Sequence, residues 1–182
     1  MRKLKNEELG RMEPEEFASA QKLNACILLD DIRSMNNVGS AFRTSDAFRV
    51  EKIYLCGITA TPPHRDINKT ALGATETVEW EHTADIKSLI KELRESGYLI
   101  VSVEQADKST RLDEFEPNTN SKYAFVFGNE VFGVNEDVVK ESDVVLEIPQ
   151  LGTKHSLNIS VSLGITIWDF CSKSGFITNQ LT

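Results

Sequence analysis

The sequence predicts an α/β protein whose mostly parallel sheet is flanked by helices. Short apolar, β-prone runs alternate with helical patterns along the chain, and this alternation is typical of parallel sheets. The 182 residues are enough for one domain with a sizeable core. A hydrophobic content of 40% and a charged content of 26% are ordinary for a globular protein. There is no internal repeat and no low-complexity segment.

The first residues predict an arm ahead of the main domain. Residues 6–22 favour one or two short helices, because Pro14 suits a first helical turn and Glu15 and Glu16 complement its positive end. We expect an N-terminal helical arm over residues 1–24 and the main domain over residues 25–182. The start MRKLKNEELG has no apolar run behind it, unlike a signal peptide. No stretch approaches the roughly 18 apolar residues of a membrane span.

Within the domain, each expected element rests on its pattern. Short apolar runs that predict strands occupy residues 26–30, 52–55, 77–80, 98–103, 123–127 and 144–148. Helical patterns occupy residues 37–48, 85–96 and 135–141. The first opens within a turn signal of Asn36, Asn37 and Gly39, and Gly97 ends the second. Polar or proline-containing stretches that predict loops occupy residues 58–68 and 107–121.

The stretch from Leu157 to Ile167 fits two structures. Its apolar residues alternate strictly with small or polar ones, and this period of two favours a strand. The alternative is a helix that is buried on several sides, in which Ser160 and Gly164 permit close packing.

The preceding segment, from Ile148 to Asn158, breaks the rules of both helix and strand. Pro149 stops a strand, because proline has no N–H for the ladder. Gly152 permits a turn, and Ser156 and Asn158 follow with short polar side chains. Such a segment favours a pocket for a small polar ligand, and a simple polar loop is the alternative.

Three loops point to one site. In open α/β sheets, ligands bind beyond the carboxyl ends of the strands. Three such ends carry the segments NNVGSAFRTSDAF, FGNEVFGVNED and EIPQLGTKHSLNISVS. In this order and at these separations, the segments resemble the three motifs of the SpoU/TrmH family, which are S-adenosylmethionine-dependent RNA ribose 2'-O-methyltransferases of the SPOUT class. The resemblance covers roughly residues 27–170.

The resemblance implies features that periodicity does not show. The family's α/β fold ends in a deep C-terminal trefoil knot, and its members are homodimers. The family places a helix after its third motif, so we expect residues 157–171 to be mostly helical. Three apolar side chains of this helix are candidates for the dimer interface, namely Ile167, Trp168 and Phe170. The family often has glycine where this chain has Arg49, which leaves the local packing open.

The resemblance also assigns site residues, motif by motif. Catalytic or positioning roles fall on Asn37, Arg43, Glu130, Ser156 and Asn158. Cofactor contacts fall on Glu104, Phe127, Gly128, Asn129, Gly133, Ile148 and Leu157. Positive side chains expected to contact RNA are Arg33, Arg49, Arg65, Lys69, Lys154 and His155.

The expected chemistry is a methyl transfer from S-adenosylmethionine without a metal. Arg43 is a poor base, since its pKa exceeds about 12, and we expect it to grip a phosphate and to stabilise developing charge. From its helix, its side chain is expected to reach the strand ends near Gly128 and Ser156. Asn37 would orient Arg43, and Glu130 would fix the loop or pair with Arg43. The three histidines, which have no ligand spacing, are His64, His82 and His155.

Charge and cysteine content limit the partners. The net charge of −8 argues against a surface covered with phosphate-binding groups, so RNA requires a local basic patch. The three cysteines are far apart, which favours reduced thiols in a cytoplasmic protein.

We expect a tRNA substrate first and ribosomal RNA second, because no additional RNA-binding domain is recognisable. The alternatives are a non-catalytic RNA-binding protein that kept the fold and an unrelated nucleotide-binding α/β protein, which lacks a phosphate-binding glycine motif.

Overall fold

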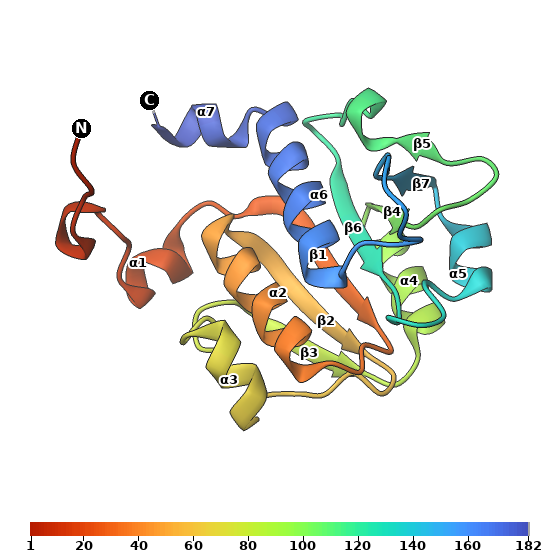
Figure 1. The fold of residues 1–182 in the computed structure, drawn as a ribbon, viewed down its shortest axis with the longest axis horizontal. Helices are drawn as coiled ribbons and strands as arrows, with labels where there is room; N and C mark the ends of the chain where they lie inside the picture. Colours follow the sequence, from red (N-terminus) through yellow and green to blue (C-terminus); the bar gives the residue numbers. More distant parts are fainter. Residues whose placement is uncertain (182) are drawn as a thin grey trace.

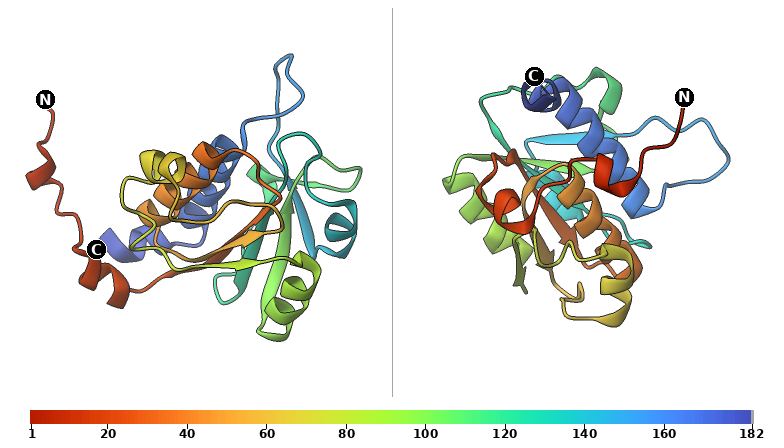
Figure 2. Two further views of the ribbon diagram at one scale, coloured as in Figure 1. Left: turned by 90° about the horizontal axis from the view of Figure 1, so that it is seen from below. Right: turned by 90° about the vertical axis from the view of Figure 1, so that its left-hand side faces the viewer.

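The computed structural model describes residues 1–181 and has a seven-stranded sheet between two layers of helices (Figures 1 and 2). The strands lie in the order β3-β2-β1-β6-β4-β7-β5, and every neighbouring pair is parallel. The strands are β1 Leu23–Asp30, β2 Val50–Cys56, β3 Trp80–Thr83, β4 Tyr98–Val103, β5 Thr110–Arg111, β6 Lys122–Phe127 and β7 Val144–Glu147. The predicted fold class is confirmed.

The helices fall into two groups. Helices α2 Met35–Ala47, α3 Arg65–Ala71 and α6 Ile159–Lys173 cover one face of the sheet, whereas α4 Ile86–Glu95 and α5 Glu136–Glu141 cover the other (Figure 2). The shorter helices are the 3-10 helices η1 Asn6–Glu8 and η2 Leu112–Glu114, with α1 Pro14–Ser19 and α7 Phe176–Leu181 near the two ends of the chain. None of the helices in the described residues is long and apolar enough to cross a membrane.

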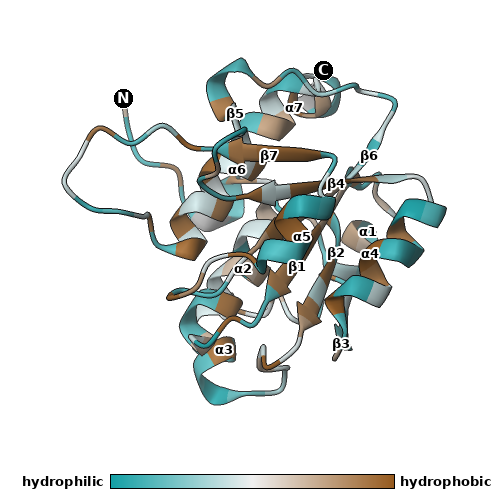
Figure 3. Cartoon of the chain, turned by 90° about the vertical axis from the view of Figure 1, so that its right-hand side faces the viewer, coloured by the Kyte–Doolittle hydropathy of each residue, from teal (hydrophilic) through white to brown (hydrophobic). Residues whose placement is uncertain are grey.

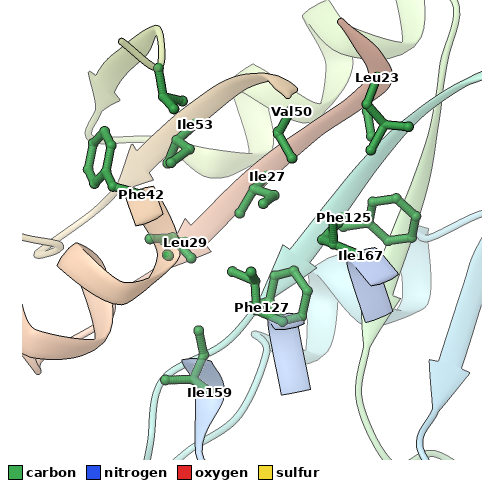
Figure 4. Close-up of a cluster of buried hydrophobic side chains, with 14 of the residues drawn as sticks. Leu23, Ile27, Leu29, Phe42, Val50, Ile53, Phe125, Phe127, Ile159 and Ile167 are labelled. Carbon is green, nitrogen blue, oxygen red and sulfur yellow. The ribbon is translucent and has the colours of Figure 1, made fainter. Parts of the chain in front are cut away.

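The central strands are apolar throughout because both faces are covered. Successive side chains of a strand point to opposite faces. In β6, Phe125 and Phe127 join the core under α2 and α6, whereas Ala124 and Val126 join the core under α4 and α5. Figure 4 shows the first core, and Figure 3 shows the apolar strands between the helical layers, with hydrophilic residues on α5.

Helix α2 lies unusually close to α3 at Gly39. Ser34 caps the helix by accepting the backbone N–H of Asn37 at 3.4 Å. A Cβ on Gly39 would overlap with the hydroxyl of Thr70 and the backbone carbonyl of Ile67, so only glycine permits this approach. This glycine therefore has a packing role beyond the turn signal that it gives in the sequence.

Some predicted boundaries are wrong. Residues 65–68, predicted as loop, begin helix α3, because the His64 ring accepts the N–H of Asp66 at 3.1 Å and so caps it. The third strand is Trp80–Thr83 instead of residues 77–80. Within the predicted loop at 107–121, the structure has the short strand β5 and the helix η2.

The ambiguous stretch is helical, as the family implied. Asn158 caps α6 by accepting the N–H of Ser160 at 2.9 Å. Ile167 and Phe170 are 0% and 2% exposed, so the expectation that they reach a dimer interface is wrong: the domain's own core covers them. Trp168 of the same helix is 54% exposed and packs beside Phe48, with ring centroids 5.9 Å apart.

The structure shows how Arg49 fits at a position where the family often has glycine. Its φ of 50° is left-handed, a conformation that glycine adopts most easily. The side chain donates to Gln180 at 2.9 Å and lies 5.2 Å from the centre of the Phe176 ring. These contacts hold α7 against the body and compensate for the strained backbone.

The first residues form the expected short helices outside the body. Residues 1–5 and 7–16 are exposed, and Phe17 is the buried side chain of α1. In Figures 1 and 2 the N-terminus stands away from the sheet.

Candidate active site

A pocket of about 740 Å³ opens at the carboxyl edge of the sheet, where the neighbouring strands β6, β4 and β7 end. The strand ends supply Val103, Phe127 and Leu146 to its wall. Two loops, residues 128–134 and 148–158, form its sides. Parallel strands end at one edge, so segments far apart in sequence meet there.

The carboxylate of Glu130, in the second motif, accepts three hydrogen bonds from the segment that contains the start of the first motif. Glu130 accepts the backbone N–H groups of Arg33 and Ser34, each at 3.0 Å, and the side-chain amide of Asn37, also at 3.0 Å. Burial alone would raise the pKa of Glu130, but these hydrogen bonds, with one from its own backbone, hold the pKa below its usual value. Glu130 is therefore ionised at neutral pH and fixes the start of α2.

Asn37 connects the first motif to the third as well. Its amide oxygen accepts from the side chain of Asn158 at 3.2 Å while its amide nitrogen donates to Glu130. Asn158 in turn caps α6. The three side chains, Glu130, Asn37 and Asn158, are called the motif network below. They join loops that follow β1, β6 and β7.

Glycines allow the second loop to fold back on itself. A Cβ on Gly128 would overlap with the backbone of Gly133 and Val134. Gly133 has a φ of 70°, and a Cβ there would overlap with the Glu104 carboxylate. Glu104 accepts the N–H of Val134 at 3.0 Å and the N–H of Gln105 at 2.8 Å, so it fixes the loop while it lines the pocket.

The side chain of Asn129 holds the same loop by hydrogen bonds. It is 9% exposed, and its side-chain amide donates to the carbonyl of Asp31 at 2.7 Å. Its side-chain oxygen accepts the N–H groups of Val131 at 2.9 Å and Phe132 at 3.2 Å. The loop conformation is thus set before any ligand arrives.

The third loop is more open. Residues 151–158 are all exposed, although Ile148 at its base is half-buried. Gln105 reaches across and donates to the backbone carbonyl of His155 at 2.6 Å. Ser156 and Leu157 line the pocket from this loop, where the sequence predicted them.

The structure does not bring every predicted residue to the pocket. Arg43 is exposed and lines a separate hollow with Asp46 and residues 71–74. Six residues along an α-helix turn the side chain about 120° away from the direction of Asn37. Among the predicted RNA contacts, Arg33 and Lys154 are exposed near the pocket loops and His155 lines the pocket.

The remaining predicted RNA contacts lie elsewhere. Arg65 and Lys69 are exposed on α3, outside the pocket lining. Arg49 is held against α7.

Sequence reasoning missed several lining residues, namely Gln105, Val131, Phe132, Gln150 and Ser162. For Phe132, the signal was an aromatic side chain in a glycine-rich loop. Among the described residues, no group of three or more His, Cys, Asp or Glu side chains could hold a metal ion. Burial raises the pKa of the Cys171 thiol to about 12, and it also raises those of Cys26 and Cys56, so none of the three is a thiolate at neutral pH.

The fold and the pocket define a class of α/β protein with a preformed ligand site built from three loops at the carboxyl edge of a parallel sheet. The sequence model of the SpoU rRNA Methylase family matches residues 24–168, and the chain belongs to this family.

Known proteins give the same picture. The chain is 30% identical over 141 residues to the 23S rRNA (guanosine-2'-O-)-methyltransferase RlmB of Neisseria meningitidis, covering 78% of this chain and 55% of that protein. The chain thus spans little more than half of this curated relative.

Two solved structures are similar in fold. The TrmH/SpoU tRNA modifying enzyme of A. aeolicus has a TM-score of 0.79 at 23% identity, covering 91% of this chain and 82% of that one. The AdoMet-bound rRNA methyltransferase of Sinorhizobium meliloti has a TM-score of 0.77 at 24% identity, covering 89% and 61%.

Proposed function

We propose that the chain is an S-adenosylmethionine-dependent RNA methyltransferase that modifies a ribose 2'-hydroxyl, in tRNA first and ribosomal RNA second. The observation that carries the proposal is the motif network, which joins the three family motifs around one pocket through Glu130, Asn37 and Asn158. A protein that had kept only the fold would not need these three polar side chains in mutual contact.

The pocket fits the cofactor. Its volume of about 740 Å³ lies in the range of small-molecule sites. Ile148 and Leu157 supply apolar surface for an adenine, and the backbone around Gly128 supplies N–H and C=O groups for its edge. Glu104 offers carboxylate oxygens to ribose hydroxyls. When bound, S-adenosylmethionine supplies an electrophilic methyl group on its sulfonium.

The chain's own residues position the reactants and do little proton chemistry. Glu130 accepts three hydrogen bonds and its pKa is lowered, so it is a weak base. Asn37 and Asn158 hold the loops in register, and Ser156 lines the mouth of the pocket. The proton of the ribose hydroxyl would pass to water at the pocket mouth. Alignment is then the main source of rate.

Arg43 acts on the RNA from outside the cofactor pocket. It is exposed on α2 and its guanidinium suits a phosphate, which it would hold in two-pronged fashion. Arg33, Lys154 and His155 would supply further RNA contacts beside the cofactor pocket. A tRNA substrate is proposed first because the A. aeolicus enzyme with a similar fold is a tRNA modifying enzyme, and ribosomal RNA is proposed second because RlmB acts on 23S rRNA.

A homodimer is part of the proposal. Val161, Ile165 and Trp168, called the α6 stripe below, are 48%, 39% and 54% exposed on one side of α6. Their spacing of four and three residues forms a continuous apolar strip, which a second copy would cover. Trp168→Asp should convert the dimer to a monomer in light scattering, whereas Ile58→Asp, at an exposed apolar side chain elsewhere, should not.

Mass mapping of methylated RNA tests the function. The purified chain is incubated with S-adenosylmethionine and either bulk tRNA or ribosomal RNA, and the products are compared with those of Asn158→Ala. We expect a 2'-O-methyl ribose at a defined position with the parent chain and a large loss with the variant. A methyl group on a base, or binding of both ligands without transfer, would overturn the proposal; the second result would favour the non-catalytic RNA-binding protein.

A further inference from the structure

Phe132 is exposed to an extent that its surroundings do not explain. It is 84% exposed, and the neighbouring Val131 is 66% exposed, although the domain buries its other phenylalanines largely or partly. Both residues belong to the loop that lines the pocket. Single exposed apolar residues are common, but an aromatic at the mouth of a polar pocket indicates a contact partner.

The exposure is built into a rigid turn. The side-chain oxygen of Asn129 accepts the Phe132 N–H at 3.2 Å, and the carbonyl of Asn129 accepts the N–H of Gly133 at 2.8 Å. Asn129 itself is 9% exposed and is fixed to Asp31. The backbone that carries Phe132 is therefore braced on both sides, and the ring is presented to solvent in a defined place.

Positively charged residues occur in two segments that neighbour this loop. Arg33 is exposed, and its backbone N–H is held by Glu130, the residue before Val131. Lys154 and His155 are exposed on the loop at the opposite side of the pocket. An aromatic platform with cations beside it is the usual composition of a site for single-stranded nucleic acid, in which bases stack and phosphates pair with the cations.

The proposed reaction gives such a platform a use. Ribose hydroxyls are also displayed in the shallow minor groove of an RNA helix, but a nucleotide of a single-stranded loop can be splayed out toward a pocket, and its unstacked base then loses favourable contacts. We propose that Phe132 stacks on the unpaired base of the target nucleotide and so holds its ribose at the pocket mouth. This inference rests on the proposed function and deepens it by assigning a specificity element to the RNA side of the site.

Two other occupants are less well supported. The cofactor has apolar surface of its own in the pocket, at the half-buried Ile148 and the exposed Leu157. A second copy of the chain would bind the α6 stripe, which lies on a helix and not on the loop of Phe132. A phenylalanine has no polar atom with which to read a base edge, so the platform would accept any base and would favour the larger purines.

Binding of two matched strands tests the assignment. The probes are a short oligoriboadenylate and a ribose-phosphate strand of the same length without bases, each titrated with fluorescence anisotropy in the presence of S-adenosylhomocysteine. The protein variants are Phe132→Ala, Phe132→Leu, Phe132→Trp and the control Ile58→Ala, which removes an exposed apolar side chain outside the pocket lining.

We expect Phe132→Ala and Phe132→Leu to weaken binding of the oligoriboadenylate about tenfold, equivalent to about 1.4 kcal/mol, and to leave the strand without bases unchanged. Phe132→Trp should keep the affinity, and the emission of its added tryptophan should fall with the oligoriboadenylate only. Ile58→Ala should match the parent chain. Calorimetry of the cofactor product should give the same affinity for all variants.

The inference is overturned if both strands lose affinity equally, if neither does, or if cofactor binding falls with RNA binding. The last result would assign the ring to the cofactor. Failure of the proposed function has a different signature, because the parent chain would then transfer no methyl group to RNA ribose whether or not the oligoriboadenylate stacks on residue 132.

Discussion

The motif network depends on the charge of Glu130, and Glu130→Gln tests this dependence with almost no change of shape. The carboxylate has one oxygen that accepts the N–H of Arg33 and another that accepts both Ser34 N–H and the Asn37 side chain. A glutamine side chain has one such oxygen. If that oxygen keeps two donors, the new amide NH₂ faces the third, and a hydrogen bond becomes a contact between two donors.

The expected loss follows from these contacts. An unsatisfied partner in a partly buried site costs roughly 1–3 kcal/mol, and the two remaining bonds lose their charge assistance. Water reaches the site, so the lower part of that range applies and the total should be about 2 kcal/mol. For a chain of this length, this corresponds to a fall in Tm of about 4–8 °C.

The lowered pKa of Glu130 also predicts how its contribution to stability changes with pH. The folded-state pKa of Glu130 lies below its ordinary value of 4.5, so the ionised carboxylate stabilises the fold above pH 4.5 and this contribution is lost as the pH falls through the folded-state pKa. The gap in Tm between the parent chain and Glu130→Gln should therefore be largest at neutral pH and should shrink in acid.

Thermal unfolding followed by circular dichroism measures both quantities. The control is Glu95→Gln, at an exposed carboxylate on the last residue of α4, and it should stay within about 0.5 kcal/mol of the parent chain. A gap that is absent at neutral pH, or one that widens as the pH falls, would refute the view that an ionised Glu130 holds the first and second motifs together.

Three further results are expected. Arg43→Ala should lower single-turnover methylation of bulk tRNA roughly 100-fold with unchanged cofactor calorimetry, because the RNA loses a clamp that positions it. Arg43→Lys should also be poor, because an ammonium cannot grip a phosphate in two places; joint loss of cofactor binding would contradict this. Gly39→Ala should destabilise the chain by at least about 2 kcal/mol in urea unfolding, since its methyl group would overlap with Thr70 and the α3 backbone; an unchanged midpoint would count against the close approach. The logarithm of RNA affinity should fall with the logarithm of salt concentration with a slope of only a few, at about 0.7–0.9 per phosphate; a slope near zero would mean that base contacts dominate.

Local patterns predicted the elements better than they predicted their boundaries. Runs such as residues 123–127 had one interpretation, because a strand buried on both faces has to be apolar throughout. The start of α3 was missed because its cap is the His64 ring, a weak signal behind two prolines. For α6, the period of two favoured a strand, and tertiary packing overrode it: the helix is buried on several sides, so small residues such as Gly164 alternate with apolar ones by chance.

The candidate site was predicted through resemblance more than through physics. The motifs named Asn37, Glu130 and Asn158, but no pattern shows that one asparagine bridges the other two residues, because this contact depends on the sheet order. Arg43 illustrates the converse: its spacing from Asn37 fits the family, while the turn of the helix carries it to another surface. Knotting, which the family implies, is rare and leaves no local mark in a sequence.

The motif network also dictates when the protein becomes competent during its synthesis. Asn37 and Glu130 are 93 residues apart, and Asn37 and Asn158 are 121 apart. The entropic cost of closing the longer loop exceeds that of the shorter by only about 0.2 kcal/mol, so chain entropy does not order the two events. Translation does: the ribosome releases residue 130 before residue 158, and α6, whose first turn Asn158 caps, emerges later still. A nascent chain can dock its first two motifs before the third wall of the pocket exists, so ligand capture begins only after Asn158 and α6 have emerged.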